Sequence, residues 1–252
     1  MHEQILYEPP RRRDRPPSQV PVYKAIGYTL DISMRFLARA AVGQATHDFQ
    51  RQLIDSYWRR IFEAGNARLR VSGREHLDPD TAYVVMSNHS SLLDIPALFG
   101  AFPGLLRMVT KEELTKIPIW GHALKKAGFI PINRKDRERA IAQLEIAKRN
   151  LQGGVSVWVA PEGTRSRTGE LGPFKKGGFH VALGLGAPIV PTWIEGARDV
   201  LEPDGFVVHY GGDVHVCFGR PIDTAGEGPE DIEALMEEVR AAMLALREGG
   251  EG

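Results

Sequence analysis

Cysteine is almost absent from this sequence. Cys217 is the only cysteine among 252 residues, so neither an internal disulfide nor a zinc site built on several thiolates can form. A reducing compartment is therefore the expected environment. Cys217 lies in a stretch of alternating apolar residues, which predicts a small buried side chain in a strand and not a reactive thiol.

Long apolar runs and an excess of one charge are also missing. No stretch of 18 apolar residues occurs, so we expect no helix that crosses a bilayer, and residues 1–10 lack the apolar segment of a signal peptide. Lysine plus arginine and aspartate plus glutamate number 32 each, and this balance argues against a general nucleic-acid binder. The histidines have no metal-binding spacing, and neither a P-loop nor a dinucleotide fingerprint is present. We therefore expect no metal, no cofactor and no nucleic-acid partner.

The remaining composition is that of a folded domain, because hydrophobic residues make up 42% and charged residues 25% of the chain. From residue 68 onward, short apolar stretches alternate with helical periodicities, which predicts an α/β fold with a mixed central sheet covered by helices. Strands are expected at residues 68–71, 82–86, 105–109, 129–132, 155–159 and 189–194. Helices are expected at residues 92–99, 119–127, 137–151, 177–185 and 229–247. A hairpin of strands 207–210 and 214–218 is expected around Gly211 and Gly212.

The N-terminal 66 residues are predicted to form two segments ahead of a main domain at residues 67–248. Residues 1–21 are rich in proline and arginine, which predicts a mobile basic tail able to contact anionic lipid head groups. Residues 22–42 and 48–64 each combine an apolar side with a basic one, so residues 22–66 are predicted to be an amphipathic helical hairpin. Such a hairpin suits a membrane surface, although packing against the core would produce the same pattern.

The segment Ser87-Asn88-His89-Ser90-Ser91-Leu92-Leu93-Asp94 carries the clearest chemical signal. It begins where a strand ends, which is where α/β folds place ligands, and it leads into a helix. From the first turns of that helix Asp94 can reach one ring nitrogen of His89, leaving the other nitrogen free to accept a proton. A helix-capping cluster with a surface histidine would explain the same residues, and the spacing alone leaves both interpretations open.

Two further segments place basic residues after strands. Residues 159–166 (VAPEGTRS) open a loop in which Arg165 is followed by Arg167, Lys175 and Lys176 ahead of a helix, a pattern typical of an anion site but also of a basic surface loop. Lys111 and Arg134 each follow another strand and are positioned to converge on a phosphate near His89.

In this order, the segments resemble the boxes of the glycerolipid acyltransferase family, and most closely those of 1-acylglycerol-3-phosphate acyltransferases. His89 and Asp94 match its N-H-x-x-x-x-D box. A second run, K-x-x-L-x-x-x-P-x-x-G, is matched from Lys111 to Gly121. The P-E-G-T-R-S box is matched at residues 161–166, and a P-I-V-P segment at residues 188–191. The resemblance covers roughly residues 80–195.

The resemblance implies a role for each matched residue. It implies that His89 is the general base on the acceptor hydroxyl and that Asp94 orients it. It also implies a site for the acceptor phosphate, formed by Lys111, Arg134, Glu162, Gly163, Thr164 and Arg165. The reaction implied is acyl transfer from an acyl-CoA or acyl-carrier-protein thioester to 1-acylglycerol 3-phosphate, which gives phosphatidic acid for phospholipid biosynthesis.

The resemblance also favours the membrane interpretation of the hairpin. The expected partners are the lipid bilayer, a lysolipid acceptor and the acyl donor, and the expected location is the cytoplasmic face of a membrane, peripheral or monotopic. Another lysolipid or glycerol 3-phosphate as acceptor, a thioesterase-like hydrolase, and a non-catalytic membrane-binding protein are the alternatives. The sequence leaves the acyl chain length, the donor and the oligomeric state open.

Overall fold

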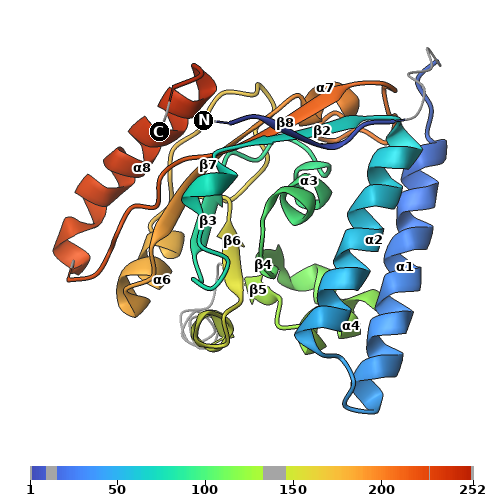
Figure 1. The fold of residues 1–252 in the computed structure, drawn as a ribbon, viewed down its shortest axis with the longest axis horizontal. Coiled ribbons are helices and arrows are strands. Elements are labelled where there is room, and N and C mark those ends of the chain that lie inside the picture. Colours follow the sequence, from blue (N-terminus) through green and yellow to red (C-terminus); the bar gives the residue numbers. More distant parts are fainter. Residues whose placement is uncertain (1, 10–15, 133–145, 227, 251–252) are drawn as a thin grey trace.

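A computed structural model describes residues 2–9, 16–132, 146–226 and 228–250. Within these residues, the protein is built around one eight-stranded sheet with helices on both faces (Figure 1). The strands are β1 (Gln4–Tyr7), β2 (Arg68–Ser72), β3 (Val84–Ser87), β4 (Leu106–Lys111), β5 (Ile130–Ile132), β6 (Ser156–Val159), β7 (Ile189–Glu195) and β8 (Asp213–Phe218). The α-helices are α1 (Val20–Ala41), α2 (His47–Gly65), α3 (Asp94–Ala101), α4 (Trp120–Lys126), α6 (Gly177–Leu185), α7 (Ala197–Val200) and α8 (Ile232–Arg247). The predicted mixed α/β fold is confirmed.

The strand order is β1-β2-β8-β7-β3-β6-β4-β5. Strands β7, β3, β6, β4 and β5 run parallel to one another, β8 is antiparallel to β7, and β2 is parallel to β8. The carboxyl ends of β3, β6 and β4 therefore lie side by side at one edge of the sheet. This edge is where an α/β fold of this type binds its ligands.

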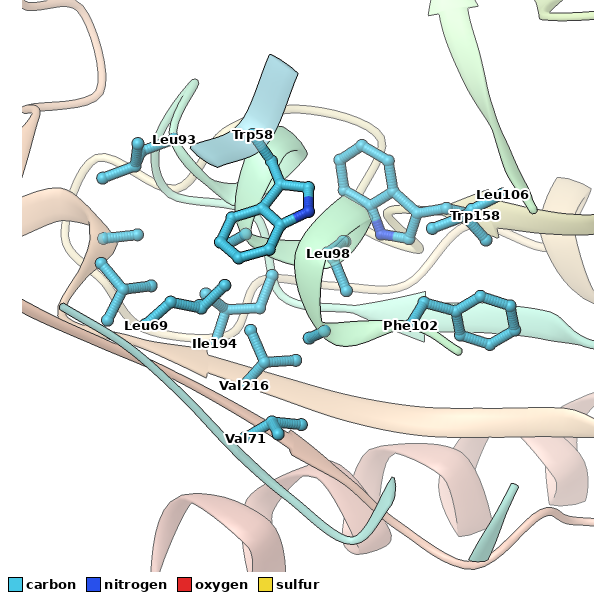
Figure 2. Close-up of a cluster of buried hydrophobic side chains, with 14 of the residues drawn as sticks. Trp58, Leu69, Val71, Leu93, Leu98, Phe102, Leu106, Trp158, Ile194 and Val216 are labelled. Atoms are coloured by element: carbon cyan, nitrogen blue, oxygen red, sulfur yellow. The ribbon is translucent and has the colours of Figure 1, made fainter. Parts of the chain in front are cut away.

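The central strands are apolar without interruption because both of their faces are buried. In β3, Val85 points into one core, which lies under α2 and α3, while Val84 and Met86 point into the other, which lies under α6 and α8. Figure 2 shows the first core, where Trp58 of α2, Leu98 of α3 and Trp158 of β6 come together. Helices on both faces thus keep the central strands fixed, and with them the loops that leave their carboxyl ends.

Helices α1 and α2 pack against each other and against the main domain, α2 on α3 and α1 on α4. The side chain of Thr46 caps α2 by accepting a hydrogen bond from the backbone N–H of Phe49. The side chains of Ser33 and Phe36 lie on the buried side of α1. On its outer side a row of apolar side chains is exposed: Tyr23, Ile26, Leu30 and Met34. No described helix is both long and apolar enough to cross a membrane.

The N-terminal segment differs from the predicted mobile tail. Residues 4–7 form β1, which pairs antiparallel with β2 at the edge of the sheet, and α1 begins at Val20. Leu6 and Tyr7 pack against the core, and Glu3 and Glu8 form ion pairs with arginines of β2. A strand this short is stable only because of its partner strand, which the local composition does not reveal. Residues 10–15, which carry the arginines of this segment, lie outside the described residues.

The predicted hairpin at residues 207–218 is wrong. Residues 213–218 form β8, but the chain before it makes only isolated bridges, from Val208 to Ser18 and to Leu201. Both edges of β8 are already occupied by β2 and β7, so no edge remains for a hairpin partner. The helix predicted at residues 137–151 lies largely outside the described residues, and the described part, residues 146–152, is helical.

Candidate active site

The turn after β3 is fixed by an asparagine amide. Asn88 Nδ2 donates to the carbonyl of Ile194 at 2.8 Å, and the N–H of Ile194 donates to Asn88 Oδ1 at 2.7 Å. This pair of bonds extends the pairing of β3 and β7 beyond the end of β3. The next residue, His89, therefore leaves the sheet edge in a defined direction.

His89 and Asp94 form a hydrogen-bonded pair. The distance from His89 Nδ1 to Asp94 Oδ2 is 2.8 Å, and the same oxygen accepts the backbone N–H groups of Ser90 at 2.8 Å and Ser91 at 2.9 Å. Asp94 is the first residue of α3 and is fully buried. The predicted proximity of these two side chains is thus found in the structure.

This geometry defines which nitrogen of His89 is available. A buried carboxylate accepts, so Nδ1 carries the proton and Nε2 keeps its lone pair. The His89 side chain is 16% exposed, and its ring meets the Trp158 ring edge-to-face with centroids 5.4 Å apart. Trp158 Nε1 in turn donates to Ser87 Oγ at 2.9 Å. The imidazole is therefore oriented from two sides, and Nε2 is the nitrogen whose lone pair can take a proton.

Glu162 joins the loop after β6 to the loop after β3. Its Oε2 accepts the N–H of Gly172 at 2.8 Å, and its Oε1 faces the N–H of His89 at 3.4 Å. The N–H of Ser166 donates to the carbonyl of His89 at 2.7 Å, which ties the same two loops a second time. Burial raises the pKa of Glu162, and the hydrogen bonds from Gly172 and His89 oppose that rise. Because both oxygens face backbone N–H groups, Glu162 shapes the loops and is not aimed at a ligand.

The predicted cations occupy different positions around this edge. Lys111 ends β4 and is exposed at the same edge of the sheet as His89. Arg165 donates to the carbonyl of Pro203 and lies 3.8 Å from the carboxylate of Asp204, so it is held by the segment after α7. Arg134 lies outside the described residues.

The middle of the P-E-G-T-R-S loop is tightly turned. Gly163 adopts a positive φ of 71°, and Thr164, the next residue, is exposed. The structure thus brings Asp94 and Glu162 each into contact with His89, and places Gly163, Thr164 and Lys111 at the same edge of the sheet. Among the described residues, no cluster of three or more His, Cys, Asp or Glu side chains could hold a metal ion.

Sequence reasoning missed three contributors to this site. The amide of Asn88 was visible only as the first letter of a box, Trp158 looked like an ordinary strand residue, and Gly172 carried no signal. An aromatic residue one position before the end of a strand otherwise rich in valine could have drawn attention to Trp158. Gly172 is recognisable only from its contact with Glu162.

These features define a class of protein: an α/β fold with a histidine that a buried aspartate orients at the carboxyl ends of parallel strands. The profile of the family described as Acyltransferase matches residues 68–195, about half of the chain. The chain belongs to this family.

Individual relatives agree with the family match. The chain is 37% identical to human "1-acyl-sn-glycerol-3-phosphate acyltransferase alpha" over 182 residues, which is 71% of this chain and 63% of the relative. It is 34% identical to the 1-acyl-sn-glycerol-3-phosphate acyltransferase of Saccharomyces cerevisiae over 72% of this chain and 61% of that one. The chain thus spans somewhat less than two thirds of the length of these relatives.

A solved structure resembles nine tenths of the chain. The crystal structure of the 1-acyl-sn-glycerophosphate (LPA) acyltransferase PlsC from Thermotoga maritima superposes with a TM-score of 0.74 at 27% identity. The match covers 91% of this chain and 94% of that one. The likeness therefore extends beyond the matched family domain to the flanking elements.

Proposed function

We propose that this protein transfers a fatty acyl group from a thioester donor to the free hydroxyl of 1-acylglycerol 3-phosphate, which gives phosphatidic acid. The observation that carries the proposal is the 2.8 Å hydrogen bond between His89 Nδ1 and the buried Asp94. The activity in the names of the relatives supports the choice of acceptor.

In this mechanism His89 Nε2 takes the proton of the acceptor hydroxyl as the hydroxyl oxygen attacks the thioester carbonyl. The new C–O bond forms, the C–S bond breaks, and the imidazolium returns the proton to the departing thiolate. Asp94 stabilises the imidazolium that exists between these two steps. Backbone N–H groups of the turns at this edge supply donors for the oxyanion.

The acceptor phosphate is held by Lys111, Arg134 and Arg165 in this proposal, with Gly163 and Thr164 forming the wall of the site. Arg165 would exchange its contact with Asp204 for the phosphate, because a dianionic phosphate is a stronger partner for guanidinium than an exposed carboxylate. Glu162 supports the wall from behind through its contacts with Gly172 and His89.

We further propose that the exposed apolar row of α1 (Tyr23, Ile26, Leu30 and Met34) lies on the cytoplasmic face of a membrane. Side chains three or four residues apart share one face of a helix, and such a face inserts into the boundary between head groups and acyl chains. Both substrates carry long acyl chains that partition into bilayers. A peripheral or monotopic enzyme would meet them there, with acyl-CoA or acyl carrier protein delivering the acyl group.

The test is acyl transfer from a long-chain acyl-CoA, and separately from an acyl carrier protein, to 1-acylglycerol 3-phosphate in detergent micelles. Wild type is compared with His89→Ala and with His180→Ala, an exposed histidine of α6 that serves as the matched control. We expect phosphatidic acid from wild type and from His180→Ala, and a loss of about 10²–10⁴ in rate for His89→Ala.

Other outcomes separate the alternatives. Release of free fatty acid without phosphatidic acid would indicate a hydrolase. Product from another lysolipid or glycerol 3-phosphate alone would correct the acceptor. Undiminished product from a folded His89→Ala variant would remove His89 from the role of base.

A further inference from the structure

Arg240, on the C-terminal helix α8, reaches the loop that follows the P-E-G-T-R-S box. Its Nη1 donates to the carbonyl of Gly172 at 2.8 Å, and its Nη2 donates to the carbonyl of Leu171 at 3.1 Å. A planar guanidinium that bonds two successive carbonyls fixes the orientation of the peptide between them. Helix α8 lies well outside residues 68–195, the part matched by the family profile.

The peptide between Leu171 and Gly172, whose carbonyl bonds Arg240, directs its N–H toward Glu162 and the active site. The N–H of Gly172 donates to Glu162 Oε2 at 2.8 Å, and Glu162 Oε1 faces the N–H of His89 at 3.4 Å. A continuous series of polar contacts thus runs from α8 to the backbone of the catalytic histidine. The packing at Gly172 is close, since a Cβ at this position would lie 3.0 Å from Glu162 Oε2.

We propose that Arg240 is a positioning residue, which fixes the peptide at residues 171–172 so that Gly172 holds Glu162 and Glu162 holds the loop of His89. This inference rests on the proposed function, because it assigns Arg240 to the same catalytic centre. It adds a residue from α8 to a site otherwise formed by loops at the ends of parallel strands.

The surroundings of Arg240 are suited to a rigid role. Its guanidinium lies over the ring of Phe174, 5.5 Å from the centroid, and Phe174 stacks on the fully buried Phe179 with centroids 6.0 Å apart. The N–H of Lys175 also donates to the carbonyl of Pro161 at 2.8 Å, which holds the far end of the loop. The positive charge of Arg240 further opposes the effect of burial on the pKa of Glu162 and so favours the ionised carboxylate, the form that accepts from two N–H groups.

The same helix offers a matched control. Arg247 forms a two-pronged ion pair with Glu170, at 2.7 and 2.8 Å, and lies over the ring of Trp193. It therefore tethers the same loop to the same helix, with a cation–π contact of the same kind, but it has no hydrogen bond to the peptide that contacts Glu162. Arg247→Met removes a contact between α8 and this loop. Arg240→Met also removes a contact between α8 and the loop, and in addition it removes the hydrogen bonds that align the peptide of Gly172.

The kinetic test compares Arg240→Met, Arg240→Lys and Arg247→Met, each in wild type and in a Glu162→Gln background. We expect Arg240→Met to lower kcat about tenfold, the effect of losing one well-aligned hydrogen bond. Arg240→Lys should restore part of the rate because an ammonium can bond one carbonyl, and Arg247→Met should stay within about twofold of wild type. In the Glu162→Gln background, Arg240→Met should cost less than about twofold, since residues that act through one another are not additive.

A second readout does not depend on acyl transfer. In protein labelled with ¹⁵N-glycine, hydrogen exchange of the Gly172 amide should be faster in Arg240→Met than in wild type and unchanged in Arg247→Met. Equal kinetic losses with and without Glu162, or unchanged exchange at Gly172, would overturn the proposal. If wild type forms no phosphatidic acid while the exchange result is as expected, the proposed function fails and the positioning contact remains.

Discussion

Asp94 makes three hydrogen bonds with a single oxygen. Oδ2 orients His89 and at the same time accepts the N–H groups of Ser90 and Ser91, which fixes the turn that leads into α3. The orientation of His89 and the shape of the turn before α3 therefore depend on the same atom. This is why a histidine and an aspartate five positions apart, each unremarkable alone, form a defined pair.

From this arrangement we expect Asp94→Asn to lower kcat by about 10²–10⁴. The neutral amide can keep the backbone contacts but no longer stabilises the imidazolium. The free energy of unfolding should fall by about 1–3 kcal/mol, because the charge-assisted hydrogen bonds from the N–H groups of Ser90 and Ser91 are weakened. Pre-steady-state kinetics measure the effect on the rate, and thermal unfolding measures the effect on stability. As a control, Asp94→Asn in a His89→Ala background should leave the residual rate unchanged. A normal kcat for Asp94→Asn would contradict the role of the aspartate.

At the scale of residues, the sequence was sufficient to predict a contact between side chains that lie close together in the chain. His89 and Asp94 share one short segment, so the turn that leads from β3 into α3 brings them together. The contact of Glu162 with Gly172, and that of Gly172 with Arg240, join segments that only the folded sheet and α8 bring together. No local pattern marks them, and neither Gly172 nor Arg240 could be predicted.

At the scale of elements, helix α1 has one buried side and one side that is apolar but exposed. Ser33 and Phe36 are buried on one, whereas the outer row, Tyr23, Ile26, Leu30 and Met34, is a third or more exposed at each position. Apolar side chains arranged at helical spacing on the surface indicate a binding surface more strongly than the same number scattered over the molecule.

We expect the double substitution Ile26→Ser/Met34→Ser to lower binding to vesicles with anionic lipid at least about tenfold, because each serine removes apolar area that would insert. Acyl transfer to a short-chain, water-soluble acceptor should be unaffected. Ile5→Ser is the matched control, since Ile5 lies on β1 and is 51% exposed, close to Ile26 at 52% and Met34 at 53%. Sedimentation with vesicles measures the effect, and equal loss from the control would show that the α1 row has no special part in binding.

Helices with strong local periodicity, such as α2 and α8, were predicted to within a few residues because the apolar pattern alone determines them. The strand β1 was missed and the hairpin before β8 was wrongly expected for one common reason. Whether a short segment becomes a strand depends on which edge of the sheet is free. The edge of β2 is free for β1, whereas β8 has no free edge for residues 207–210.

At the scale of the whole molecule, Cys217 reports on the integrity of the fold. It lies in β8, between β2 and β7, and burial raises its pKa to about 11. The thiolate is the reactive form, so at pH 8 only about one molecule in a thousand carries it in the folded state. Labelling of the thiol therefore requires exposure of an interior strand.

We expect a thiol reagent at pH 8 to react slowly with the native protein and rapidly in denaturant, with the labelling rate following global unfolding. The stability contribution of the protonated thiol is fully present below pH 9, its ordinary pKa, and is lost as the pH rises toward 11. A Cys217→Ala variant should therefore show a smaller decrease in unfolding free energy between pH 9 and 11 than wild type. Rapid labelling of the native protein at pH 8 would contradict this account.

The strand order also has a consequence for how the protein is made. β3 carries the loop of His89, yet both of its neighbours in the sheet, β6 and β7, are synthesised long after it. β6 must enter between β3 and β4, two strands that leave the ribosome earlier and cannot pair with each other in the final sheet. A nascent chain that ends before β6 therefore exposes the unpaired edges of both strands, the condition in which chains aggregate or need a chaperone. The contacts that join the loop of His89 to Glu162, and through Gly172 to Arg240, are therefore completed only after β6 and α8 have been synthesised.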